Sequence, residues 1–423
     1  MKIEIVSSSD ITGGAARAAF RLHTSLKKIN VHSEMLVRTK KSDDQSVKGD
    51  IGFLKSTLNV FKFKFGSLIN RLQQSPNTNF RSGNWLPSRW SKKINTLNVD
   101  IVNLHWIAGE SLSIEDIGRI NKPIIWTLHD MWPFCGTEHY TNDDANARWR
   151  KPYTRESRSE KDSGLDIDLI AWKRKKHAWA SKKMHIISPS TWLSKCARES
   201  ELFKDMPIYT IPNPLDTSTF KPLCPIFSKN ALNLPQGTNI ILFGAIGGGK
   251  DARKGQDLLV ESFQHFKNSH ADQNTICVIF GESEPKQHKR FPLPTYWLGH
   301  IHDDTTLALL YSAASVMVVP SRQENLPQTA TEAQSCGCPV VAFNCTGLID
   351  AVSHKQTGYL AQAFDTLDLA VGIEWVLSDN SRHEQLKINA RQRALSLWSP
   401  EVVIPQYIEV YQRAIDEYAM VNK

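Results

Sequence analysis

The most informative part of the chain is residues 321–341, which read SRQENLPQTATEAQSCGCPVV. One apolar run, residues 315–320, precedes this segment, and a second, residues 339–343, overlaps its end. This order predicts a strand, a loop, a helix and another strand. Glu324 falls in the loop at the carboxyl end of the first strand, and Glu332 falls on the helix, which a glycine and a proline end.

The same alternation extends in both directions along the chain. We predict strands at residues 3–7, 32–37, 100–106, 123–129, 184–188 and 208–211, then at 239–245, 275–281, 296–301, 315–320 and 339–343, with amphipathic helices such as 15–29, 256–268 and 305–314 between them. Strands joined by helices form parallel sheets. A Pro-rich segment near residue 211 separates two such series. The fold class is therefore α/β, with two doubly wound, Rossmann-like domains, residues 1–213 and 214–399, and a cleft where ligands bind.

Two carboxylates around a helix start suit a nucleotide-sugar ligand. The backbone amides at a helix N-terminus favour an anionic phosphate. A carboxylate on the loop can accept hydrogen bonds from sugar hydroxyls, and one on the helix can bind a ribose diol. Glutamates eight residues apart also fit solvated surface charge, so the pair alone does not decide between the two interpretations.

The wider pattern resembles the E-x7-E element of family 4 of the retaining GT-B glycosyltransferases, of the exopolysaccharide, O-antigen and capsule type. The residues that match are Pro320, Ser321, Glu324, Pro327, Glu332, Ala333, Cys336, Gly337, Pro339, Val340 and Val341. The resemblance implies that Glu324 contacts the donor sugar, as a catalytic residue, and that Glu332 contacts the ribose. The Gly-Phe-Gly that usually follows the first Glu is Asn325-Leu326-Pro327 here, and we count Asn325, Leu326 and Gln328 as donor-binding.

Further donor-binding residues follow from the same resemblance. Gly244 and Lys254 match the phosphate-binding region, and a Lys there would neutralise the leaving diphosphate. Ala245 stands where the family often has an Arg, and Arg253 or Lys250 could substitute for it. Gly13 and Gly14, which open the first predicted helix, resemble the glycine-rich loop of the N-terminal domain.

The first half also carries candidates at predicted strand ends. His129 matches a catalytic position of the family, although a buried structural histidine is the plain alternative. His105 and Trp106 end another strand, on the acceptor side. The resemblance also implies that residues 400–423 form a final helix that crosses back onto the N-terminal domain.

Charge is unevenly distributed along the chain. Residues 1–213 hold 34 Lys and Arg against 22 Asp and Glu, a net of +12, whereas residues 214–423 hold 17 against 21, a net of −4. A basic half implies an anionic partner. Residues 55–73 (KSTLNVFKFKFGSLINRLQ) combine phenylalanines with lysines, which is typical of a helix on an anionic membrane surface or of a helix packed on its own domain.

These features predict the location and partners. The chain has no apolar run long enough to span a membrane, and its seven cysteines lack zinc spacing. We expect a cytoplasmic protein, peripheral on the inner face of the membrane. We expect it to need no cofactor and no metal, because no metal-ligand cluster accompanies the donor motif. The expected partners are a nucleotide-sugar donor, a lipid-linked or free oligosaccharide acceptor and an anionic membrane, but no nucleic acid.

Three other functions would each fit part of this pattern. A nucleotide-sugar epimerase or hydrolase would share the nucleotide site but needs no basic acceptor half. A dinucleotide oxidoreductase needs G-x-G-x-x-G after a strand, and the first turn, residues 10–16 (DITGGAA), lacks it. A nucleic-acid-binding protein would fit the positive charge, but no basic–aromatic motif of that kind is present.

Overall fold

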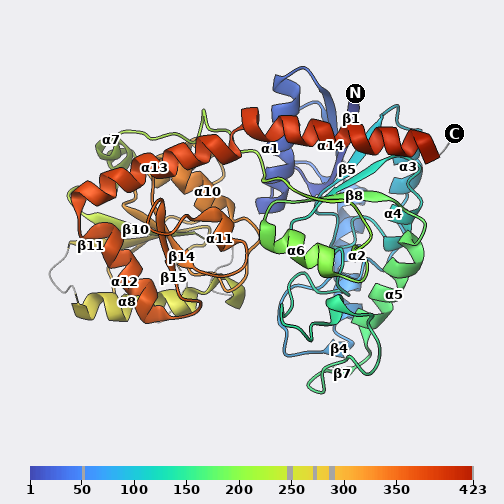
Figure 1. The fold of residues 1–423 in the computed structure, drawn as a ribbon, viewed down its shortest axis with the longest axis horizontal. Coiled ribbons are helices and arrows are strands. Elements are labelled where there is room, and N and C mark those ends of the chain that lie inside the picture. The colour runs from blue at the N-terminus through green and yellow to red at the C-terminus, as the bar shows by residue number, and fades with distance from the viewer. Residues whose placement is uncertain (50–52, 245–250, 270–273, 285–290, 422–423) are drawn as a thin grey trace. The chain divides into compact units, whose positions relative to one another are not determined.

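The computed structural model describes the chain except residues 50–52, 245–250, 270–273, 285–290 and 422–423. The chain forms two compact units (Figure 1). Unit 1 comprises Met1–Asn213 and Ile404–Lys423, and unit 2 comprises Pro214–Val403. The boundaries predicted from the sequence lie after residues 213 and 399, whereas the units divide after Asn213 and Val403.

Unit 1 is built on a seven-stranded sheet in which every neighbouring pair is parallel. In spatial order the strands are β3 (Val47–Gly49), β2 (His32–Thr39), β1 (Lys2–Ser9), β5 (Ile101–Leu104), β6 (Ile124–Thr127), β8 (Met184–Ser188) and β9 (Ile208–Thr210). The strand order reverses between β1 and β5. Ligands of doubly wound sheets bind at the carboxyl ends of the strands beside such a reversal.

Helices flank this sheet (Figure 1). They are α1 (Gly14–Lys28), α2 (Phe53–Asn70), α3 (Trp90–Thr96), α4 (Ile114–Gly118), α5 (Ile167–Trp179), α6 (Thr191–Glu199) and α14 (Pro400–Val421), with a short antiparallel pair, β4 (Gln73–Gln74) and β7 (Ser163–Gly164). Side chains cap three of them: Ser113 accepts from the Asp116 amide at α4, Asp166 from the Leu169 amide at α5, and Ser190 from the Leu193 amide at α6. From α14, Tyr411 accepts a 2.7 Å hydrogen bond from Asn103 of β5.

Unit 2 has a six-stranded sheet, also parallel throughout. Its strands, in spatial order, are β12 (Thr295–Trp297), β11 (Thr275–Phe280), β10 (Asn239–Gly244), β13 (Val316–Val319), β14 (Val340–Phe343) and β15 (Gly358–Ala361). The helices are α7 (Pro225–Ala231), α8 (Gln256–Ser269), α9 (Asp304–Ala313), α10 (Gln328–Ser335), α11 (Leu348–Ala351), α12 (Thr366–Leu377) and α13 (Asn380–Trp398). Central strands such as β13 are unbroken apolar runs because helices cover both faces.

The two units confirm the predicted α/β class with Rossmann-like halves. In the two parallel sheets, β3 and β15 were not predicted; they are three and four residues long, and their sequences, VKG and GYLA, carry little apolar pattern. The short pair β4 and β7 was not predicted either. Two other strands end two residues earlier than predicted: β5 ends at Leu104 and β6 ends at Thr127. His105, Trp106 and His129 therefore lie in the loops that follow these strands.

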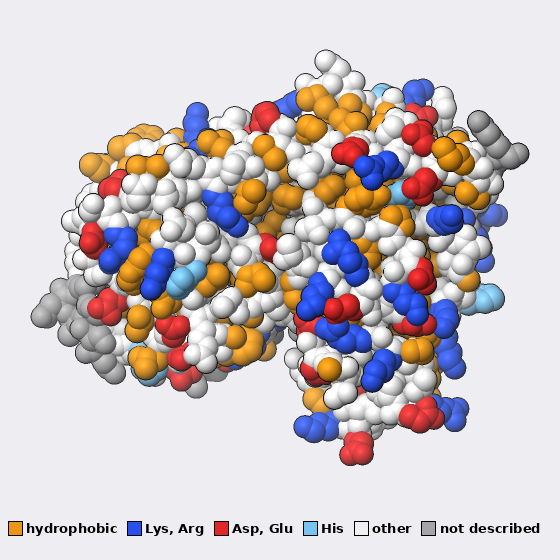
Figure 2. All heavy atoms as spheres, in the orientation of Figure 1, with side chains coloured by type: hydrophobic (Ala, Val, Ile, Leu, Met, Phe, Trp, Pro, Cys, Tyr) orange, Lys and Arg blue, Asp and Glu red, His pale blue; other side chains and the backbone are white. Residues whose placement is uncertain are grey.

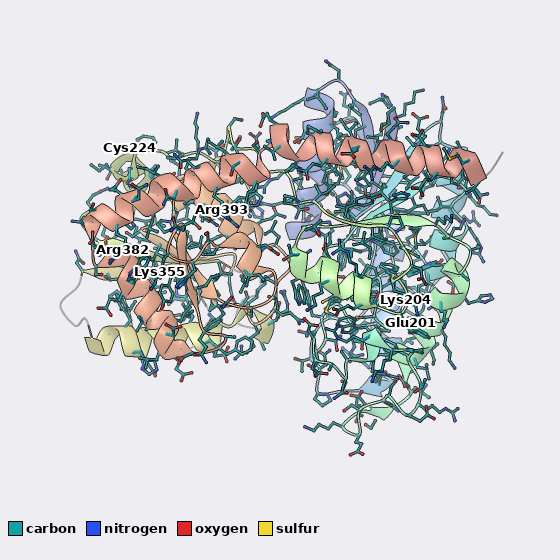
Figure 3. The ribbon with its side chains drawn as sticks, in the orientation of Figure 1. Glu201, Lys204, Cys224, Lys355, Arg382 and Arg393 are labelled. Atoms are coloured by element: carbon teal, nitrogen blue, oxygen red, sulfur yellow. The ribbon has the colours of Figure 1, made fainter. Side chains whose placement is uncertain are left out.

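The surface charge of unit 1 is mixed. Figure 2 shows its Lys and Arg side chains interspersed with Asp and Glu. Exposed ion pairs account for part of this pattern, such as Lys204 with Glu201 at 2.8 Å (Figure 3). On the face shown, the basic side chains thus do not form one uniformly positive patch.

The seven cysteines are all free thiols. Five are buried, as expected for small core residues, but Cys224, which precedes α7, is exposed (Figure 3). None of the described helices is long and apolar enough to cross a membrane.

Candidate functional site

Glu324 and Glu332 are both buried in unit 2. Glu324 lies in the loop between β13 and α10, and Glu332 lies on α10, as the sequence predicted. Their residues are only 6% and 3% exposed. Burying a carboxylate is costly unless charges or hydrogen bonds compensate it. The pair is therefore not solvated surface charge, and each carboxylate should have partners.

Glu324 is held by two cations. Its Oε1 atom lies 2.5 Å from Lys254 Nζ and 3.3 Å from Arg253 Nη1, and it accepts a 3.1 Å hydrogen bond from Ser321 Oγ. Burial by itself raises the pKa of a carboxyl group, but the charges of Lys254 and Arg253 outweigh it and lower the pKa of Glu324 to about 2. Glu324 is therefore ionised at neutral pH.

The loop that carries Lys254 approaches the end of β13 closely. Lys254 and Arg253 form a 3-10 turn, η2 (Ala252–Lys254), which Gly255 ends with a φ of 69°. A Cβ atom at Gly255 would lie 1.9 Å from the carbonyl oxygen of Pro320. Only glycine fits here, for conformation and for space. Since β10 and β13 are neighbours, their loops bring Lys254 to Glu324.

Glu332 has a different partner. Its Oε2 atom accepts a 2.8 Å hydrogen bond from the hydroxyl of Tyr311 on α9. The sequence analysis did not single out Tyr311, because α9 is separated from the E-x7-E segment and its tyrosine reads as an ordinary core aromatic. Tyr311 fixes the side chain that the resemblance assigns to ribose.

The other donor-site candidates surround this loop. Gly244 ends β10, and a Cβ atom there would lie 2.1 Å from the ring of Phe280. Asn325 and Leu326 are buried beside Glu324, and Gln328 is the first residue of α10. Ala245 and Lys250 lie outside the described residues, so of the two candidate substitutes for the family Arg, the structure describes Arg253.

In unit 1, His105 and His129 form a pair at neighbouring strand ends. His105 Nδ1 lies 2.9 Å from His129 Nε2. Burial lowers the pKa of His129 to about 4 and holds the pKa of His105 well below its ordinary value. Both rings are therefore neutral at neutral pH, and one donates to the other. Among the described residues, His105 Nε2 has no hydrogen-bond partner.

A second network lies beside this pair and was missed by the sequence analysis. Asp130 accepts a 2.9 Å hydrogen bond from Trp106 Nε1 and lies 2.6 Å from His139 Nδ1. His139 Nε2 in turn lies 2.8 Å from Ser82 Oγ. The only available signal was that Asp130 directly follows His129 at a strand end. The network fixes the ring of Trp106, the acceptor-side candidate.

Gly13 and Gly14 lie where β1 leads into α1. Gly13 has a φ of 90°, and a Cβ atom built there would meet no atom within 4 Å. The backbone at this position is thus open on one side, which suits a ligand but does not identify one.

Metal ligands are not assembled in the described part of the chain, where no group of three His, Cys, Asp or Glu side chains is placed to hold an ion. Asp166 and Asp168, which form a D-x-D sequence, have other roles. Asp166 caps α5, and Asp168 forms a 2.7 Å ion pair with Arg81.

Comparison with known proteins agrees with this geometry. Residues 227–393, within unit 2, match the sequence model of the family described as glycosyl transferases group 1. The D-inositol 3-phosphate glycosyltransferase of Jonesia denitrificans is 27% identical over 318 residues, which cover 70% of this chain and 67% of the relative. Three further relatives of this kind are covered over 46%, 52% and 50% of their own length.

A shorter match and a solved structure extend the comparison. The N,N'-diacetylbacillosaminyl-diphospho-undecaprenol alpha-1,3-N-acetylgalactosaminyltransferase of Campylobacter jejuni is 30% identical over 106 residues, 25% of this chain and 28% of the relative. Anabaena HepE, solved with UDP-glucose, superposes with a TM-score of 0.67 at 14% identity and covers 98% of this chain and 100% of its own. The fold is therefore GT-B, and the matches together support a glycosyltransferase.

Proposed function

We propose that this chain is a retaining glycosyltransferase that transfers a sugar from a nucleotide-sugar donor to a glycan acceptor. The observation that carries the proposal is the cluster of Lys254, Arg253 and Glu324 beside the N-terminus of α10. Two cations meet at one oxygen of Glu324 there, and Asp251 pairs with Arg253 at 3.0 Å. Such a cluster can bind a diphosphate through its cations and a sugar hydroxyl through its carboxylate.

The chemistry follows from these roles. Lys254 and Arg253 stabilise the negative charge that develops on the leaving diphosphate, so neither a metal nor a cofactor is required. The bond between the anomeric carbon and the phosphate oxygen breaks. A bond from the acceptor oxygen forms on the same face, and the acceptor proton passes to the leaving phosphate. Glu324 binds the donor sugar, Glu332 binds the ribose, and neutral His129 serves as a hydrogen-bond partner of the sugar.

The acceptor in this proposal is a lipid-linked oligosaccharide of bacterial surface polysaccharide synthesis, bound while the protein lies on the inner face of the membrane. Support comes from α2. Phe61, Phe65 and Leu68 are 60%, 40% and 60% exposed, and their spacing puts them on one face of the helix. Lys64 is exposed on the same helix, and the whole basic excess lies in residues 1–213. The Campylobacter jejuni relative, by its name, acts on a diphospho-undecaprenol substrate.

The proposal is tested by thermal stabilisation with a panel of UDP-, GDP- and other nucleotide sugars. At least one of them should raise the melting temperature of the wild type and fail to do so for Lys254→Ala. The matched control is Lys387→Ala, which removes a lysine of unit 2 from a simple surface pair with Glu384 and should keep the full shift. A shift that Lys254→Ala retains, or no shift with any nucleotide sugar, would reject the donor site.

Transfer and hydrolysis are separated in a second assay. An epimerase or hydrolase on the same fold would consume the donor fully without an acceptor, whereas a transferase should turn over much faster when a glycan acceptor is present.

A further inference from the structure

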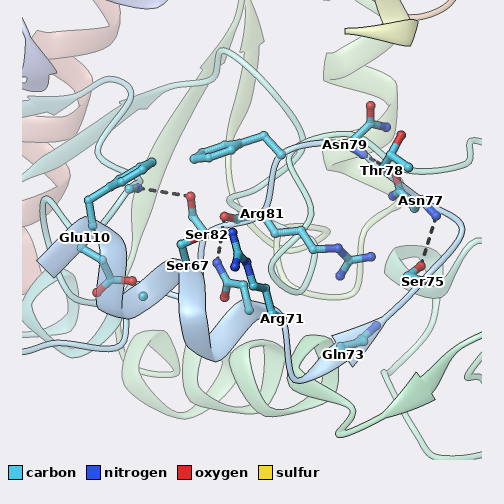
Figure 4. A pocket seen from close by; sticks show the side chains of 15 residues that line it. Ser67, Arg71, Gln73, Ser75, Asn77, Thr78, Asn79, Arg81, Ser82 and Glu110 are labelled. Atoms are coloured by element: carbon cyan, nitrogen blue, oxygen red, sulfur yellow. Dashed lines mark hydrogen bonds between the residues drawn. The ribbon is translucent and has the colours of Figure 1, made fainter. Parts of the chain in front are cut away.

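A cavity of about 360 Å³ opens in unit 1, and neither of the two residues proposed as acceptor-side contacts lines it. Its lining comes from three segments: one face of α2, residues 73–82, and the pair Gly109 and Glu110 (Figure 4). Asn77, Thr78 and Asn79 lie on the opposite side of the cavity from Glu110 (Figure 4). Its size falls within the range of small-molecule sites.

The helix α2 has two distinct faces. Phe63, Gly66, Ser67 and Asn70 line the cavity at the spacing i, i+3, i+4 and i+7. The exposed apolar face described above, Phe61, Phe65 and Leu68, follows i, i+4 and i+7. At about 100° per residue, these two faces point in directions about 180° apart. The cavity therefore belongs to a different surface from the one proposed to meet the membrane.

Two aromatic rings form one wall of the cavity. Phe63 and Phe80 stack with their ring centroids 6.2 Å apart, and they are 42% and 45% exposed. Their half-exposed rings give the cavity a flat apolar surface. Such a surface contributes the hydrophobic contact in a small-molecule site. The C–H face of a pyranose ring is flat and apolar and would cover them.

The polar lining matches hydroxyl groups better than it matches an anion. Asn77 and Asn79 both donate to the carbonyl of Tyr140, at 3.0 and 3.1 Å, which fixes their orientation. The Oδ1 atom of Asn79 then accepts no hydrogen bond from the described residues. Ser67 and Thr78 add hydroxyls to the lining.

The charges of the lining largely cancel. Arg81 is neutralised by Asp168, which is buried 2.7 Å away. Glu110 also lines the cavity, on the opposite side from the asparagines, and burial raises its pKa. Arg71 is the other cation among the lining residues. This balance suits a neutral polar ligand and gives a diphosphate little advantage.

The floor of the cavity joins the network at the strand ends. Ser82 lines the cavity, and its Oγ atom lies 2.8 Å from His139, which contacts Asp130 and so holds Trp106. The ring of Phe80 lies 6.2 Å from that of Trp106 and 4.9 Å from that of His139. A ligand stacked on Phe80 is thus next to the proposed acceptor side.

We propose that this cavity binds a sugar residue of the acceptor, stacked on Phe63 and Phe80 and hydrogen-bonded to Asn79. This inference rests on the proposed glycosyl transfer and specifies its acceptor. Because α2, about 10–12 Å across, separates the cavity from the apolar face, the sugar bound here lies about a helix diameter from the membrane surface. The acceptor must therefore already carry a saccharide, and a lipid diphosphate alone does not fill the site.

Ligand-observed NMR with a panel of methyl glycosides of neutral hexoses and N-acetylhexosamines tests the proposal. At least one glycoside should give a saturation-transfer signal with the wild type, and Phe80→Ala should weaken its binding about three- to tenfold, the effect of one lost aromatic contact. Leu68→Ala, which truncates an exposed residue on the other face of α2, should leave the signal unchanged. Inorganic pyrophosphate should not displace the glycoside.

Several outcomes would overturn the proposal: no glycoside signal, a signal that Phe80→Ala leaves intact, or displacement by pyrophosphate, which would assign the cavity to an anion. The nucleotide-sugar thermal shift is measured on the same samples. A retained shift without glycoside binding rejects the cavity and leaves the proposed function standing. A glycoside signal that depends on Phe80, without any nucleotide-sugar shift, supports the cavity and rejects the proposed donor site.

Discussion

Lys254 and Arg253 contact the same oxygen of Glu324 at different distances, 2.5 and 3.3 Å. Arg253 is also engaged by the carbonyl of Gln323 at 2.8 Å and by Asp251 at 3.0 Å. Lys254 is thus the cation better able to move to an incoming diphosphate. We expect Lys254→Ala to lower activity more than tenfold at low donor concentration, since a charge-assisted contact contributes about 1.5–3 kcal/mol. Arg253→Ala should have a smaller effect; steady-state kinetics with limiting donor measure both, and a wild-type rate in Lys254→Ala would contradict the assignment.

The two glutamates should separate kinetically. Glu332→Ala should mainly raise the KM for the donor, because it removes a ribose contact, whereas Glu324→Ala should mainly lower kcat, because the sugar contact is next to the reacting carbon. Tyr311→Phe is the matched probe of the first effect, since it removes only the hydroxyl that holds Glu332. Its effect should be in KM alone. Circular dichroism controls for folding, and unchanged kinetics in both glutamate variants would remove the donor site.

His129 predicts a pH dependence of stability. Its pKa is about 4 in the folded protein, against about 6.5 when unfolded, because burial disfavours the charged ring. The unfolded state therefore binds protons first as pH falls, so the free energy of unfolding should drop between pH 6.5 and 4. His129→Asn should flatten this part of the profile by roughly 1–3 kcal/mol. Urea unfolding across this range measures it, and parallel profiles of variant and wild type would show that His129 titrates normally.

At the scale of elements, the sequence predicted those strands and helices that have a strong local pattern of apolar residues. Glu324 and Glu332 were located correctly because apolar strands on either side define the loop and helix between them. Tyr311 and His139 were not found, because their roles depend on contacts between distant segments that no local pattern encodes. The sequence of residues 55–73 predicted a basic amphipathic helix. It did not predict that the apolar residues of this helix divide into a cavity face and an exposed face, because that depends on the segments packed against the helix.

The exposed face of α2 should bind anionic vesicles. Phe61→Ser with Leu68→Ser should abolish sedimentation with such vesicles, because it removes two of the three apolar side chains of that face. Lys62→Glu with Lys64→Glu should weaken binding and its salt dependence, since each cation near the surface contributes about 1 kcal/mol. A soluble-acceptor assay should stay active. Phe227→Ser, at an exposed position on α7 of unit 2, is the control. No binding of the wild type at low salt would leave a soluble acceptor as the better interpretation.

At the scale of the whole molecule, the proposed chemistry relies on cations that the chain itself supplies. Transfer should therefore persist in excess EDTA, because Lys254 and Arg253 take the place of a divalent ion at the diphosphate. Initial rates with and without chelator are the measurement. Complete loss of activity that magnesium or manganese restores would reject the metal-free mechanism.

Unit 1 is assembled from two distant parts of the chain, whereas unit 2 is continuous. The hydrogen bond from Asn103 of β5 to Tyr411 of α14 is buried, and it joins residues 308 positions apart. During synthesis the ribosome makes the 190 residues of unit 2 after β5 and before the end of α14, which takes roughly 10–40 s at about 5–20 residues per second. For that time the central sheet of unit 1 lacks a helix that covers it, so unit 2 can complete its folding first although its residues emerge later.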